Sequence, residues 1–285
     1  MIQAIVLDID GVIIGNKKGF NWPLPNVEVL STLKKLCEEG IVVSLCTSKG
    51  TFAAKEIIEK AHLDNLHIGD GGAVIVDFIK NKTFEINFIE KDFIKKLVTE
   101  FQKNNIYLEL YNSTGYFIDK KTASNNLRSK HAKILYQQPK IVDNLLDKVD
   151  NIEIVKIMPI PKNENEKNIV IDIFQSFKKD LTLQWGVHPT AHPAEFGAIT
   201  KKGISKGESV KKIFNFYKIP LKNILGVGDG MTDWGFIKLC GYKGIMGNSS
   251  EELKKALNQK DKNSFTGTGV NENGLLSIFK YFKLI

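Results

Sequence analysis

Side chains that carry oxygen or amide groups follow four apolar runs of this sequence, at the points where the runs end. They are Asp8 and Asp10 in LDIDGV, Thr47 and Ser48 in LCTSKG, Asp229 and Asp233 in GVGDGMTD, and Asn248 in IMGN. Clustered carboxylates repel one another unless a cation lies among them. Oxygen-rich sites suit Mg²⁺, which keeps several waters and shares its coordination with a substrate phosphate. If the four ends meet, these residue types predict phosphoryl chemistry with Mg²⁺ as cofactor.

Two carboxylates and a lysine supply the groups that such chemistry needs. An aspartate beside Mg²⁺ and a phosphate can attack phosphorus and form an aspartyl-phosphate. A carboxylate two residues further on can protonate the leaving oxygen and then activate water. Lys206, just before a predicted helix, is a candidate to balance the negative charge. Each piece alone has an ordinary explanation as a strand end, a helix N-cap or a surface lysine. The prediction rests on their combination in this order along the chain, with the acids and hydroxyls at the ends of apolar runs.

The spacing of apolar residues predicts elements that bring these ends together. Runs at 4–9 and 41–46 alternate with helical patterns at 26–39 and 51–63. This alternation predicts an α/β fold with a doubly wound parallel sheet. Ligands of such sheets bind beyond the carboxyl ends of the strands. The sheet therefore places the four polar strand ends at one edge.

The pattern changes between residues 85 and 192. Strands are expected there at 106–111, 115–119, 152–158 and 181–187, and helices at 90–104, 122–135 and 140–149. The α/β pattern returns from about residue 195, with a helix at 206–218. We expect a catalytic core formed by residues 1–84 and 193–285, with an α+β domain inserted at 85–192.

Composition limits the classes of partner and the compartment. The net charge of +8 comes almost entirely from scattered lysines, with Arg128 as the only arginine. Base readout and bidentate phosphate contacts favour arginine, so we expect no nucleic-acid partner. No apolar run approaches the length of a membrane span, and the first residues lack the pattern of a signal peptide. We expect a cytoplasmic enzyme with no membrane partner. The sequence does not predict the oligomeric state.

Together these segments resemble the haloacid dehalogenase superfamily of phosphatases, most closely its Cof-type branch (subfamily IIB). The resemblance implies a Rossmann-like core. In that branch a cap domain is inserted between the second and third motifs, as at 85–192 here. The segments IMGNSSEELKKAL and GTGVNENGLLSIF are similar to the branch's C-terminal part. The chain also departs from the family. Family members often have Thr-Gly-Arg where this chain has Thr47-Ser48-Lys49, and Asn-Asp where it has Thr232-Asp233.

The resemblance implies a role for each matching residue. Asp8 would be the nucleophile and Asp10 the general acid and base. The transferring phosphoryl group would be held by phosphate-binding residues, namely Gly11, Thr47, Ser48 and Lys206. Mg²⁺ would be held by the Asp8 carboxylate, the Asp10 backbone carbonyl and Asp229, with Asp233 in support.

The expected reaction is hydrolysis of a small phosphorylated metabolite, such as a sugar phosphate or similar phosphomonoester, through an aspartyl-phosphate. A phosphomutase of the phosphomannomutase-like type is an alternative, and a non-catalytic regulator that binds sugar phosphates is another. The leaving group is expected to meet the cap. Asn248 and the two histidines in WGVHPTAHPAEF, His188 and His192, are the candidates for substrate contact.

Overall fold

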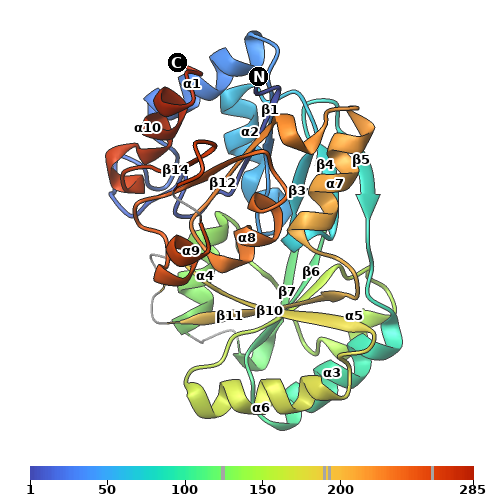
Figure 1. Cartoon of the computed structure of the whole chain (residues 1–285). Helices are drawn as coiled ribbons and strands as arrows, with labels where there is room; N and C mark the ends of the chain where they lie inside the picture. Colours follow the sequence, from blue (N-terminus) through green and yellow to red (C-terminus); the bar gives the residue numbers. More distant parts are fainter. Residues whose placement is uncertain (123–125, 189–190, 192–193, 258–259) are drawn as a thin grey trace.

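The fold consists of a parallel-sheet core and a second, mostly antiparallel sheet beside it (Figure 1). A computed structural model describes residues 1–285 except 123–125, 189–190, 192–193 and 258–259. In the described part of the chain, no helix has both the length and the apolar character needed to cross a membrane.

The core sheet has five parallel strands in the order β14-β13-β12-β1-β2. They are β1 (Ala4–Leu7), β2 (Val42–Leu45), β12 (Ile224–Gly228), β13 (Tyr242–Ile245) and β14 (Ser264–Thr266). The predicted parallel α/β architecture is confirmed. Because β1 pairs with both β2 and β12, the first residues of the chain occupy the interior of the sheet. The ends of β1, β2 and β12 therefore lie side by side.

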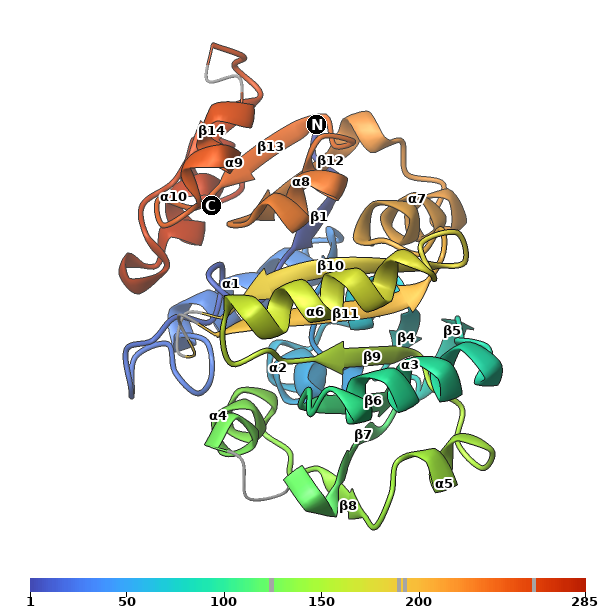
Figure 2. The same cartoon turned by 90° about the horizontal axis from the view of Figure 1, so that it is seen from below.

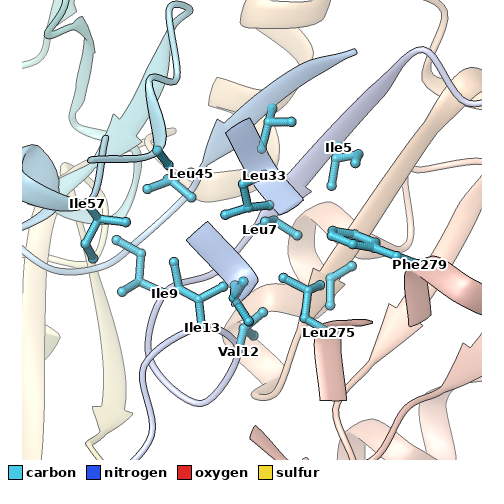
Figure 3. Close-up of a cluster of buried hydrophobic side chains, with 14 of the residues drawn as sticks. Ile5, Leu7, Ile9, Val12, Ile13, Leu33, Leu45, Ile57, Leu275 and Phe279 are labelled. Atoms are coloured by element: carbon cyan, nitrogen blue, oxygen red, sulfur yellow. The ribbon is translucent and has the colours of Figure 1, made fainter. Parts of the chain in front are cut away.

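Helices cover both faces of this sheet because side chains alternate along its strands. Ile5 and Leu7 pack into one apolar cluster, while Ala4 and Val6 pack into another on the opposite face. The first cluster receives α1 (Val27–Glu38), α2 (Lys55–Ala61) and α10 (Gly274–Tyr281). Figure 3 shows side chains of this cluster around Leu7, including Leu33 and Phe279. The other face receives α7 (Lys206–Phe216), α8 (Met231–Ile237) and α9 (Glu251–Ala256).

A short antiparallel sheet leads from the core into the insert. It comprises β3 (His67–Gly69), β4 (Val74–Asp77) and β5 (Lys82–Ile86). The insert contains a six-stranded sheet in the order β10-β11-β9-β6-β7-β8. Its strands are β6 (Leu108–Asn112), β7 (Gly115–Asp119), β8 (Lys140–Val142), β9 (Lys156–Pro159), β10 (Leu181–Val187) and β11 (Glu195–Lys201).

Only one face of the cap sheet is covered by long helices of its own. α3 (Lys91–Lys103) and α6 (Glu164–Gln175) pack on the face turned away from the core, together with the short α5 (Leu146–Val149) (Figure 2). The other face is turned toward the core, where α4 (Asn126–Leu135) lies at its edge. This face carries Tyr111, Met158 and Phe196, which form one cluster with Phe52 and Ala53 of the core. The cap thus presents a sheet face to the strand ends of the core.

Three details of the insert differ from expectation. We expected the return to the core at residue 193, but β11 pairs with β10 along seven residues and belongs to the cap sheet. Residues 140–149 were expected to be helical, whereas the structure has the strand β8 followed by a single helical turn, α5. The helix α6 was not predicted. We therefore propose that the cap extends to Lys201.

A buried histidine fixes the end of β2, which leads into Thr47. His67 accepts a hydrogen bond from the Leu45 backbone N–H at its Nδ1 (3.1 Å), and its Nε2 lies 3.0 Å from the Leu63 carbonyl. The side chain is therefore satisfied as a neutral imidazole. Burial lowers the pKa of His67 from 6.5 to about 4.

We predict that stability falls as the pH is lowered from about 6.5 to about 4, because the unfolded chain binds a proton at His67 before the folded chain does. Above about pH 6.5 the full contribution is present. The difference between the pKa of His67 in the unfolded and folded chains corresponds to about 3 kcal/mol of unfolding free energy. Urea unfolding of the wild type and His67→Asn across this range measures it, and the variant should show the smaller pH dependence.

His62→Asn is the matched control, since His62 is exposed at the end of α2. Its pH dependence should follow the wild type. Equal pH dependence for His67→Asn and the wild type would contradict the role assigned to His67.

Candidate active site

Lys206 lies between two aspartates at the edge of the core sheet. Its Nζ is 2.7 Å from Asp8 Oδ1, at the end of β1, and 2.7 Å from Asp233 Oδ1, in the first turn of α8. Ser205 caps α7, because its side chain accepts from the Glu208 N–H, so Lys206 starts the helix and points into the site. All three charged side chains are buried. Burial alone would lower the pKa of Lys206, but Asp233 and Asp8 outweigh it and raise the pKa well above its usual value.

Asp229 lies against the loop after β1 at Gly11, which has no side chain. A Cβ at Gly11 would lie 1.9 Å from Asp229 Oδ2, and Gly11 has a φ of +77°. Asn248 joins the two segments by donating to the Gly11 carbonyl (3.0 Å) and to Asp229 Oδ2 (3.3 Å). Asn248 Oδ1 accepts from the Val270 N–H at 2.7 Å. Asn248, expected to contact substrate, thus holds the Gly11 loop against Asp229.

Two side chains, those of Lys49 and His188, contact the Asp10 carboxylate. Lys49 Nζ lies 2.7 Å from Asp10 Oδ1, and His188 Nε2 lies 2.9 Å from the same oxygen. Burial would raise the pKa of Asp10, but Lys49 and His188 outweigh this effect and lower it. His188 follows β10 of the cap, so this contact joins the cap to the core.

The loop after β2 is also held from the cap. Lys156 of β9 is fully buried, and its Nζ lies 2.8 Å from Asp70 Oδ1 and donates to the Ser48 carbonyl at 2.9 Å. Asp70 Oδ2 accepts from the Thr51 N–H and hydroxyl. Thr47 Oγ1 accepts from the Lys49 N–H at 3.1 Å, and the Thr47 side chain faces the cavity. The loop is therefore fixed at both of its ends.

Three carboxylates, those of Asp8, Asp229 and Asp233, lie close together at this edge. Ligand atoms of Asp8, Asp229 and Asp233 lie within 4.8 Å of one another. Burial and then the charge of Asp233 raise the pKa of Asp8 to about 7, and burial and neighbouring acids raise the pKa of Asp229 well above its usual value. A divalent cation beside Asp8 and Asp229 would remove this repulsion, so the donor set fits Mg²⁺. Both Asp233 oxygens are engaged, by Lys206 and by the N–H groups of Asp229 and Gly230. Asp233 therefore suits a supporting position.

These groups open into a cavity of about 720 Å³ between core and cap. Its core side includes Asp8, Asp10, Thr47 and Lys206, and its cap side includes residues of α4, β9, β10 and β11. Such a volume accommodates a small ligand.

The structure brings the predicted site residues together at this cavity. They are Asp8, Asp10, Gly11, Thr47, Ser48, His188, Lys206, Asp229, Asp233 and Asn248. His192 lies outside the described residues. Sequence reasoning missed Lys49 and Lys156 as partners of site residues. The departure from Thr-Gly-Arg at Lys49 was a signal, whereas nothing near Lys156 in the sequence distinguishes it from other lysines.

The sequence profile of the haloacid dehalogenase-like hydrolases matches residues 5–274, which is nearly the whole chain. The chain belongs to this family. The expected placement in its Cof-type branch of phosphatases, and with it the expectation of a phosphoric monoester hydrolase, is confirmed.

Relatives of this hydrolase differ in the substrates that their names record. It is 22% identical to the 5-amino-6-(5-phospho-D-ribitylamino)uracil phosphatase of Bacillus subtilis, covering 96% of each chain. It is 23% identical to a phosphoglycolate phosphatase of Methanobrevibacter smithii, covering 95% of this chain and 96% of the relative. The crystal structure of a haloacid dehalogenase-like hydrolase from Bacteroides thetaiotaomicron has the same fold. Its TM-score is 0.83 at 17% identity, over 100% of both chains.

We predict that Gly11→Ala lowers phosphatase activity about a hundredfold, because the new Cβ displaces Asp229. The positive φ adds about 1 kcal/mol of destabilisation. Hydrolysis of an aryl phosphate with excess Mg²⁺, measured beside thermal unfolding, separates the two effects.

Gly19→Ala is the matched control. Gly19 has the same φ of +77°, but a Cβ there meets nothing within 4 Å. It should lose similar stability and keep its activity. Equal activity in the two variants would contradict the close approach of Gly11 and Asp229.

Proposed function

We propose that the protein is a Mg²⁺-dependent phosphatase that hydrolyses a small phosphomonoester through an aspartyl-phosphate on Asp8. The observation that carries the proposal is the position of Asp8 beside Lys206, Asp229 and the cavity. A buried carboxylate held this way is oriented toward an incoming phosphorus atom.

In the first step, an oxygen of Asp8 attacks phosphorus and the ester oxygen leaves. Asp10, two residues later, donates a proton to that oxygen. Lys206, the Thr47 hydroxyl and the Gly11 N–H would hold the oxygens of the transferring group, where charge develops. Ser48, whose carbonyl accepts from Lys156, belongs to the same phosphate-binding loop.

In the second step, Asp10 takes a proton from a water that attacks the phosphoryl group on Asp8. This role needs Asp10 to alternate between protonated and ionised forms. Lys49 and His188 favour the ionised form, which is the form that the second step requires. We propose that both are positioning residues for Asp10.

Mg²⁺ would be held by Asp8, Asp229 and the Asp10 backbone carbonyl, with Asp233 in support. When bound, it supplies the positive charge that lets an anionic carboxylate approach an anionic phosphate. We assign Asn248 a positioning role, because its amide is committed to Gly11, Asp229 and Val270.

The substrate is a small-molecule ester, since the cavity is enclosed by the cap on the side where a leaving group would lie. The relatives at about equal identity act on different esters, so their names do not select one. Hydrolysis is favoured over a phosphomutase reaction by the phosphatase names of these relatives. We place the enzyme in the cytoplasm, to which the three free cysteines are suited.

We predict that Asp8→Asn lowers kcat at least about a thousandfold, because an amide cannot replace the nucleophile. A chelator should abolish wild-type activity, and added Mg²⁺ should restore it. Phosphate release from an aryl phosphate measures both effects, with circular dichroism as the check on folding.

Asp64→Asn is the control, because Asp64 is an exposed acid paired with Lys80 away from the cavity. It should retain wild-type turnover. Retention of most activity by folded Asp8→Asn would overturn the assignment of the nucleophile.

A further inference from the structure

The cap side of the cavity is largely apolar. It is formed by α4 and by the core-facing side of the cap sheet, through Ile134, Leu135, Met158, Gly186 and Phe196. Ile134, Leu135 and Met158 are buried, and Phe196 packs against the same cluster. Because the phosphate end is fixed at Asp8 and Lys206, the leaving group would lie against this wall.

One histidine stands in the wall in a fixed orientation. His131 Nδ1 lies 2.8 Å from Glu109 Oε2, whose carboxylate is fully buried and also accepts from Tyr107 (2.8 Å) and Tyr111 (2.6 Å). The His131 ring lies 4.7 Å from the Phe196 ring between centroids, at 37°. The two rings form a continuous aromatic surface at the cavity.

The hydrogen-bonding side chains of the cap wall that are titratable already have partners. Among the described cap residues that line the cavity, the titratable side chains are those of His131, Lys156 and His188. Lys156 is held by Asp70 and the Ser48 carbonyl, and His188 contacts Asp10. A polyhydroxylated leaving group needs a partner for each buried hydroxyl, and burying one without a partner costs about 1–3 kcal/mol. The wall offers few such partners.

We propose that this wall is a subsite for an apolar ring carried by the alcohol of the phosphate ester, with the rings of His131 and Phe196 as its aromatic contacts. Aromatic side chains and buried aliphatic groups favour such a ring through removal of its surface from water and through ring contacts. The inference rests on the proposed function and narrows its substrate class.

Gly186 leaves room for this ring. It lies in β10, lines the cavity, and a Cβ at this position would meet nothing within 4 Å. A larger side chain at this position would project into the space that the ring is proposed to occupy.

The test compares 2-phenylethyl phosphate with glucose 6-phosphate. Both are esters of primary alcohols that carry a six-membered ring, but only the second ring bears hydroxyls. We expect kcat/KM to be at least roughly tenfold higher for 2-phenylethyl phosphate, mainly through KM. Equal or higher kcat/KM for glucose 6-phosphate would overturn the subsite.

Gly186→Val should reduce this preference several-fold, because the added methyl groups enter the subsite. Thr182→Val is its control, since Thr182 lies four residues away on the same side of β10 and does not line the cavity. It should keep the wild-type preference. An unchanged preference in folded Gly186→Val would place the ring elsewhere and overturn the proposal.

Binding to Asp8→Asn in Mg²⁺, measured by calorimetry, separates failure of the subsite from failure of the proposed function. We expect 2-phenylethyl phosphate to bind at least roughly tenfold more tightly than glucose 6-phosphate. Tighter binding without hydrolysis by the wild type would support the subsite and overturn the phosphatase proposal. Hydrolysis of both esters, together with equal affinity for them, would support the phosphatase proposal and overturn the subsite.

Discussion

The crowding of acids at one edge of the core sheet is the constraint on which the rest of the site depends. Asp8, Asp229 and Asp233 come from two segments far apart in the sequence, yet their ligand atoms lie within 4.8 Å. Burial, and after it the charges of neighbouring acids, raise the pKa values of Asp8 and Asp229 despite the nearby Lys206. A cation bound among these acids would reduce their repulsion, and a phosphoryl group could share its coordination.

The same edge explains why a separate cap is needed. The core supplies charge and oxygen ligands, whereas the cap supplies most of the apolar wall. The cap reaches the core through His188 on Asp10 and through Lys156 on Asp70 and the Ser48 carbonyl. These contacts link the residues proposed for acid–base chemistry and phosphate binding to the surface proposed for the leaving group. The residues proposed for the reaction and those proposed for substrate selectivity thus line one cavity between the core sheet and the cap sheet.

Sequence reasoning reached the core because its signals are local. A buried parallel strand is a continuous apolar run, and its last residues necessarily lie at the ligand edge, so Asp8 and Asp229 could be placed without coordinates. The cap was harder, because pairing of β11 with β10 depends on contacts that no local pattern records. Lys156 likewise resembles any other lysine until β9 places it beside Asp70. His188 was considered, but its partner Asp10 lies 178 residues away in the chain.

The central claim is that Asp8 becomes phosphorylated, and trapping this state tests it most directly. The enzyme is mixed with a phosphate ester and Mg²⁺, quenched in acid during turnover and treated with borohydride, which reduces an aspartyl-phosphate to homoserine. Peptide mass spectrometry then locates the reduced residue. The account predicts homoserine at position 8 in the wild type and none in Asp8→Asn. Homoserine at another aspartate, or its absence during confirmed turnover, would contradict the account.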